Sequence, residues 1–119
     1  GREFVFGVVD CYTLCRDWYN REFGLNLSDY DRRDQFWLRG ENLYLDNFAK
    51  EGFYPIPLEE LQYGDAILMQ LESPLPNHAA VYLGDQLILH HLQKRLSSRD
   101  VYGGYYLKST ARVLRHESR

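Results

Sequence analysis

The sequence predicts an α+β fold, with N-terminal helices packed on a C-terminal antiparallel β-sheet. Two observations predict it. Apolar residues follow a helical spacing over residues 11–24, and after residue 64 they fall into short β-rich runs bounded by Gly, Pro or Asp. Helical patterns that precede a run of strands are typical of α+β domains. A chain of 119 residues has the length of one domain, so we expect a single domain over residues 1–119.

The first helix is predicted over residues 11–24, with Asp10 as its N-cap and Gly24 just past its end. Residues 26–42 are polar and predict a loop or short helix, and residues 42–53 predict a second helix that ends at Gly52. The buried stripe of the first helix follows the spacing i, i+3, i+4 and i+7, and consists of Cys11, Leu14, Cys15 and Trp18.

The second half of the chain predicts strands. Pro55 and Pro57 break the chain before them. Gly84-Asp85 predicts a tight hairpin turn between the second and third strands, and Gly64-Asp65 predicts a turn before the first strand. The predicted strands are residues 65–71, 78–83, 87–91 and 111–114.

Charge and composition exclude several classes of protein. The net charge is −3, which argues against a generally basic nucleic-acid-binding protein, although residues 92–119 carry +5 and residues 1–91 carry −8. No apolar run approaches the roughly 18 residues of a membrane span, so we expect none. Cys11 and Cys15 lie four residues apart on one predicted helix, a spacing that does not suit disulfide geometry. The chain has no CxxC or HExxH zinc signature.

Cys11 is the candidate nucleophile, because the free N–H groups and dipole at a helix start lower a thiol pKa. Position alone fits a small buried hydrophobic residue equally well, and that is the role we expect for Cys15. His78 begins one predicted strand, and His90 and His91 end the next. A histidine pair at one end of a hairpin, near a helix-start cysteine, matches the thiol, base and orienting group of a cysteine hydrolase.

Which histidine joins His78 depends on the hairpin loop. A two-residue loop at Gly84-Asp85 pairs His78 with His91, whereas a three-residue loop pairs it with His90. Turn chemistry favours the shorter loop and therefore His91. In either case one histidine lies beside His78 and the other points to the opposite face of the sheet.

Four segments, taken in order, resemble the NlpC family of papain-like cell-wall cysteine peptidases. They are Asp10-Cys11 at a helix start, LQYGD at 61–65, NHAAVYLG at 77–84 and ILH at 88–90. The resemblance covers residues 4–115 and implies a papain-like NlpC-type fold. It also implies that Cys11 is the nucleophile, His78 the general base and His90, twelve residues later, the residue that orients His78. This spacing selects His90 over His91, and no cofactor or metal is implied.

The resemblance is closest to the peptidase domain of lambda-like phage tail assembly proteins. It implies an endopeptidase that hydrolyses peptidoglycan stem peptides at the D-γ-glutamyl–diamino acid bond. The implied partners are the stem peptide and other phage tail proteins. The implied location is the phage tail, or the host cytoplasm during assembly, with action on the host periplasmic cell wall. Because the chain begins with Gly1 and lacks an initiator Met, we expect a domain excised from a longer tail protein.

Two departures from the family pattern stand out. Tyr12-Thr13 replaces the usual Ser-Gly after the cysteine, and the segment 4–7 lacks the tyrosine hydroxyl that often assists the site. Three alternatives remain: an inactive tail-tip module that binds a partner protein, a lecithin–retinol-type acyltransferase, and a zinc site of Cys11, His78 and His90. The acyltransferases place their cysteine after the histidines, and the zinc site lacks a locally spaced ligand pair.

Several other residues receive simpler expectations. Trp18 is expected in the core, and Phe36-Trp37 to be partly exposed beside a substrate groove. Tyr105-Tyr106 is expected in a loop next to the site, and His116 on the surface.

Overall fold

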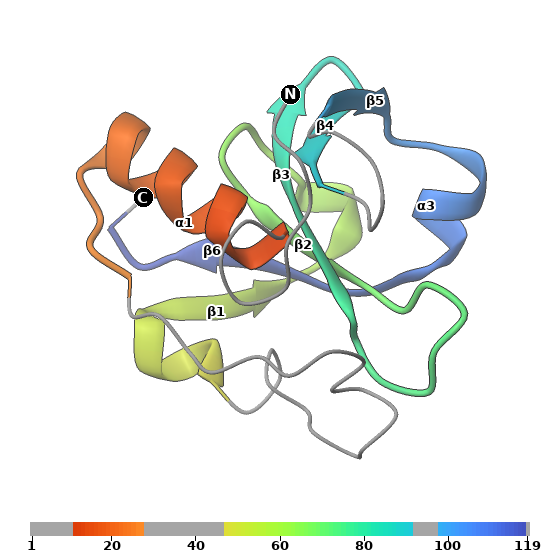
Figure 1. The fold of residues 1–119 in the computed structure, drawn as a ribbon, viewed down its shortest axis with the longest axis horizontal. Coiled ribbons are helices and arrows are strands. Elements are labelled where there is room, and N and C mark those ends of the chain that lie inside the picture. Colours follow the sequence, from red (N-terminus) through yellow and green to blue (C-terminus); the bar gives the residue numbers. More distant parts are fainter. Residues whose placement is uncertain (1–10, 28–46, 92–97, 119) are drawn as a thin grey trace.

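A six-stranded sheet, in the order β1-β6-β2-β3-β4-β5 with every pairing antiparallel, forms the centre of the computed structural model (Figure 1). The structure describes residues 11–27, 47–91 and 98–118. The strands are β1 (Phe53–Ile56), β2 (Ala66–Met69), β3 (His78–Gly84), β4 (Leu87–His90), β5 (Ser98–Val101) and β6 (Thr110–His116). The helical elements are α1 (Cys11–Phe23), η2 (Ala49–Glu51), η3 (Leu58–Glu60) and α3 (Gly104–Lys108). A helix followed by an antiparallel sheet agrees with the predicted α+β class.

Helix α1 begins at Cys11, as the apolar spacing predicts, and ends at Phe23 before Gly24, whose φ of 67° suits a glycine at a helix end. Three residues of its apolar stripe, Leu14, Cys15 and Trp18, are buried, with Cys15 5% and Trp18 4% exposed. The helix lies against β3 and β4, and Figure 1 shows its first residues, in red, next to β3. Within the described part of the chain, no helix has the length and hydropathy needed to cross a membrane.

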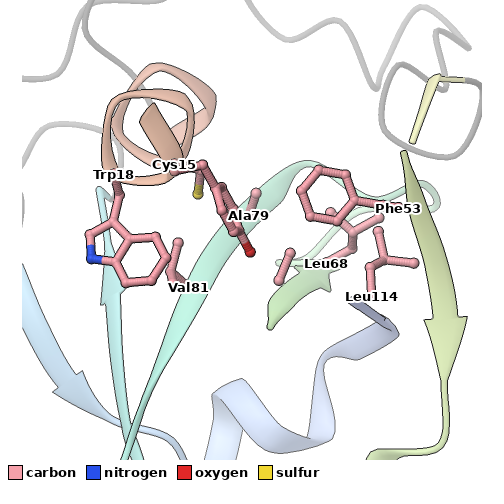
Figure 2. Packing of buried hydrophobic residues seen from close by; sticks show 9 residues of the cluster. Cys15, Trp18, Phe53, Leu68, Ala79, Val81 and Leu114 are labelled. Carbon is pink, nitrogen blue, oxygen red and sulfur yellow. The ribbon is translucent and has the colours of Figure 1, made fainter. Parts of the chain in front are cut away.

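The two faces of the sheet carry separate apolar clusters. Side chains of α1 pack on one face, and Figure 2 shows Cys15 and Trp18 of this helix-side cluster above Ala79 and Val81 of β3. Ala80, which lies between those two residues, points to the opposite face. The far-side cluster on that face contains Ile67, Met69, Ala80, Ile88 and Tyr102. Both faces of the central strands are therefore covered.

The N-terminal side of the sheet differs from the prediction. Residues 53–56 form β1, an edge strand on β6, although Pro55 was expected to break the chain; an edge position tolerates the missing N–H. The first part of the predicted second helix, residues 42–46, lies outside the described ranges, and its described end is the short 3-10 helix η2, closed by Gly52 at a φ of 88°. The stretch 26–42, with Phe36-Trp37, lies outside the described residues from 28 onward.

The hairpin between β3 and β4 also differs from both predicted registers. Tyr82 pairs with Ile88 and Gly84 with Leu87, so a bulge falls at Leu83. The two-residue loop is Asp85-Gln86, in which both residues have positive φ. As a result Ala80, rather than His78, lies opposite His90.

Asp65 is more than a turn residue. Its side chain is 1% exposed and accepts two hydrogen bonds from Arg115 of β6, at 3.0 Å from Nε and 2.9 Å from Nη2. It also accepts the backbone N–H of Gln62 at 2.8 Å. The ion pair thus ties the segment before β2 to β6.

We expect Arg115→Met to lower the free energy of unfolding by about 3 kcal/mol, because it leaves a buried carboxylate without its cation. Urea unfolding checks this. Arg112→Met is the matched control, since Arg112 is exposed on the same strand, and it should cost less than about 0.5 kcal/mol. Equal losses in the two variants would contradict a stabilising role for the pair.

Candidate active site

Two histidines and an aspartate form a continuous hydrogen-bonded array. His78 Nε2 lies 2.8 Å from His90 Nδ1, and His90 Nε2 lies 2.6 Å from Asp100 Oδ2. His78 is 4% exposed and His90 is fully buried, whereas the Asp100 side chain is 39% exposed. The array therefore runs from the interior, at His78, to the protein surface, at Asp100. The contact that the family spacing predicts, between His78 and His90, is confirmed.

The sheet register brings the array together. His78 is the first residue of β3, and His90, the last residue of β4, lies opposite Ala80. Residues 78 and 80 point to the same face of β3, so the imidazoles are diagonal neighbours on the far-side face. Asp100 pairs with Ile88 in β5, which puts its carboxylate diagonally next to His90.

The start of β3 is held by Asn77. Its side chain accepts the N–H of Leu71 at 2.8 Å and donates to the carbonyl of Leu71 at 3.1 Å. Its own backbone N–H donates to the carbonyl of Met69 at 3.0 Å. These bonds close the 71–77 connector and fix the position at which His78 leaves it.

Tyr106 covers His90 from the side of α3. The two rings meet edge to face, with centroids 5.0 Å apart and planes at 89°. The predicted loop at Tyr105-Tyr106 is wrong: both residues lie in α3, and Tyr105 is exposed. A hydrogen bond between Tyr102 and Thr110 joins the segments on either side of α3.

Burial keeps His78 neutral. Loss of solvent is the main reason that its pKa falls from 6.5 to about 3, and the nearby imidazoles of His90 and then His91, which disfavour a further positive charge, add to the effect. A neutral imidazole has one bare ring nitrogen that accepts a hydrogen bond, and with so low a pKa His78 holds a proton there only when a negative charge such as a thiolate lies beside it.

This low pKa has a consequence for stability. The unfolded chain binds a proton at His78 below about pH 6.5, whereas the folded chain does not until about pH 3, so acid favours unfolding in this window. We expect His78 to account for a loss of about 2 kcal/mol in the free energy of unfolding between about pH 6.5 and 4.5. Urea unfolding of the wild type and of His78→Gln at both pH values measures it. A pH dependence equally steep in the variant would contradict the neutral, buried histidine.

Cys11 opens α1, but its side chain lies outside the described residues, as does the predicted N-cap Asp10. The body of α1 covers the helix-side face, whereas the array lies on the far-side face. Although His78 lies on the face away from the body of α1, its ring is buried and does not face solvent. The predicted approach of the Cys11 sulfur to His78 lies outside the described residues.

The remaining candidates have plainer positions. Cys15 is a buried cysteine of the helix-side cluster, as expected. His91 follows β4 and is fully buried. The surface position predicted for His116 is wrong: it is 8% exposed, with Nε2 3.0 Å from the carbonyl oxygen of Glu51. Among the described residues, no group of three or more His, Cys, Asp or Glu side chains is placed to hold a metal ion.

Sequence reasoning missed Asp100. It lies in the basic segment 92–119 and in β5, a strand that the apolar pattern did not predict because three of its four residues are polar. The available signal was its acidity, since Asp100 and Glu117 are the acidic residues of that segment.

Comparison with known proteins gives a consistent result. The NlpC/P60 family matches residues 1–115. The chain is 44% identical over 118 residues to the tail tip assembly protein K of Escherichia phage lambda, and 37% identical over 120 residues to the tail tip assembly protein K of Escherichia phage N15. These alignments cover 99% and 98% of this chain, but 59% and 48% of the two relatives.

Proposed function

Because this chain belongs to the NlpC/P60 family, we propose that it is a cysteine peptidase acting on peptidoglycan stem peptides. The bond it would cleave joins D-γ-glutamate to a diamino acid. The observation that carries the proposal is the buried contact between His78 and His90, at the start of a strand against which the Cys11 helix packs. The proposed roles are nucleophile for Cys11, general base for His78 and positioning residue for His90.

The chemistry would run in two stages. His78 takes the proton of the Cys11 thiol, and the thiolate attacks the peptide carbonyl carbon. The N–H groups at the start of α1 are suited to stabilise the oxyanion. His78 then gives its proton to the leaving amine, and a thioester remains on Cys11. Water, deprotonated by His78, attacks this thioester and releases the new carboxylic acid and the Cys11 thiolate, which takes the proton back from His78.

Within a phage tail, such an activity would open the cell wall locally during genome entry or process a tail component during assembly. The likeness to two tail tip assembly proteins supports this setting. The proposed partners are therefore the stem peptide and other tail proteins, and the proposed place of action is the host periplasmic cell wall. Before entry, the protein would reside in the phage tail or in the host cytoplasm during assembly.

Digestion of a defined stem peptide and of purified peptidoglycan tests the proposal. Mass spectrometry should find a new D-γ-glutamyl carboxylate and a new diamino acid amine. The matched control is the same protein alkylated with iodoacetamide, which should be inactive. Cleavage that survives complete alkylation of Cys11, or no cleavage by protein with a free thiol, would overturn it.

A second candidate is a tail-tip module that binds a partner protein without catalysis, and the assembly names of the relatives favour it. The reactivity of the Cys11 thiol separates the two candidates. A purely structural module has no need for Cys11 to react faster than an ordinary thiol, so fast alkylation of Cys11 at mildly acidic pH would favour the peptidase. Alkylation at the rate of a free cysteine would favour the structural module.

A further inference from the structure

We propose that Asp100 is a positioning residue for the proposed hydrolysis, and that it sets the tautomers of both histidines in the array. The inference rests on the proposed function and concerns how the base is prepared. Its geometric basis is the 2.6 Å contact of Asp100 Oδ2 with His90 Nε2 and the 2.8 Å contact of His90 Nδ1 with His78 Nε2.

The hydrogen-bond directions follow from the carboxylate. An ionised carboxylate accepts only, so His90 carries its proton on Nε2 and donates it to Asp100. In the proposed resting state His90 is neutral, so its Nδ1 is bare and accepts the proton on Nε2 of His78. His78 is neutral, so its Nδ1 is left bare. One carboxylate thus selects, through two rings, the nitrogen that is available to take a thiol proton.

The surroundings keep Asp100 suited to this role. Its carboxylate is 39% exposed, so it stays hydrated on one side, and Ser98 Oγ donates to the same Oδ2 at 3.3 Å. His90 is fully buried and its ring is covered by Tyr106. The buried ring of His90 therefore has little freedom to turn. The partly exposed carboxylate of Asp100 supplies negative charge that stabilises the imidazolium formed on His78 during turnover.

Asp100→Asn tests the inference because the amide group is able to donate as well as accept. Donation to a bare Nε2 of His90 moves the His90 proton to Nδ1, which in turn moves the His78 proton to its own Nδ1. That tautomer of His78 has no free nitrogen for the thiol. We expect kcat on the stem peptide to fall about 10- to 100-fold, with KM within about threefold.

A spectroscopic measurement makes the test specific. The 15N shifts of the imidazole nitrogens separate bare from protonated sites, so Asp100→Asn should change the shifts of both His90 and His78. The matched control is Asp85→Asn, the same change at an exposed turn residue whose positive φ suits asparagine. It should leave both kcat and the 15N shifts unchanged.

The possible failures are distinguishable. If Asp100→Asn keeps the wild-type kcat and 15N shifts while the wild type cleaves stem peptides, Asp100 has no positioning role and the proposed function stands. If the wild type cleaves nothing, the proposed function fails, and the 15N shifts alone decide on Asp100: shifts unchanged by Asp100→Asn overturn its role, and shifts changed at both histidines support it.

Discussion

Cys11→Ala should reduce stem-peptide hydrolysis by about four orders of magnitude or more while the chain stays folded. The expectation follows from the proposed mechanism, in which the Cys11 thiol forms the thioester, and loss of a nucleophile removes nearly all covalent catalysis. Initial rates on the stem peptide, with circular dichroism spectra to confirm folding, measure the effect.

Cys15→Ala is the matched control, because Cys15 lies one turn further along the same helix. Its thiol is 5% exposed in the helix-side cluster, so its removal should cost roughly 1 kcal/mol of stability and leave kcat within a few-fold of the wild type. The reverse result, an inactive but folded Cys15→Ala and an active Cys11→Ala, would assign the nucleophile to the other sulfur.

The parts of the fold that the sequence predicted are those with a strong local pattern. The apolar stripe of α1 and Gly24 after it predicted the first helix, because a helix needs only its own periodicity and a residue that tolerates positive φ at its end. Likewise, β2, β3 and β4 are short β-rich runs bounded by turn residues. In contrast, β5 is polar and gains its place by pairing with β4, which no local pattern reveals.

The hairpin explains why the two arguments about His90 and His91 disagreed. Turn chemistry at Gly84-Asp85 assumed an unbulged ladder, but the bulge at Leu83 moves the loop to Asp85-Gln86. That shift puts His90 on the face of His78, as diagonal rather than direct neighbours. The family spacing therefore predicted the contact correctly, whereas both registers drawn from the loop length were wrong.

The polar residues whose positions or roles were predicted wrongly have partners that are distant in the sequence. Asp65 and Arg115 are fifty residues apart, and His116 reaches the carbonyl of Glu51, which is sixty-five residues away. Asp100 joins the array only because β5 lies next to β4. Which residues become partners depends on the order of the strands in the sheet. A prediction made from each residue's local sequence alone therefore favours a turn or a surface position.

His78→Ala is expected to lower kcat about 10³- to 10⁴-fold, because the thiol loses the base that activates it and the leaving amine loses its proton donor. The matched control is His91→Ala, the same change at a neighbouring, fully buried histidine. His91→Ala should leave kcat within about threefold in protein shown to be folded, although its burial implies some loss of stability.

His90→Ala is expected to have an effect on kcat between those of His78→Ala and His91→Ala. In this variant His78 loses the partner at 2.8 Å, so its ring orientation and tautomer are no longer selected. We expect a fall in kcat of about 10- to 100-fold, well beyond that of His91→Ala. Steady-state rates for the three alanine variants, at one pH and one stem-peptide concentration series, measure the order His78, His90, His91. If His91→Ala were as damaging as His90→Ala in folded protein, the orienting role would belong to both histidines or to neither, and the contact between His78 and His90 would be a packing feature.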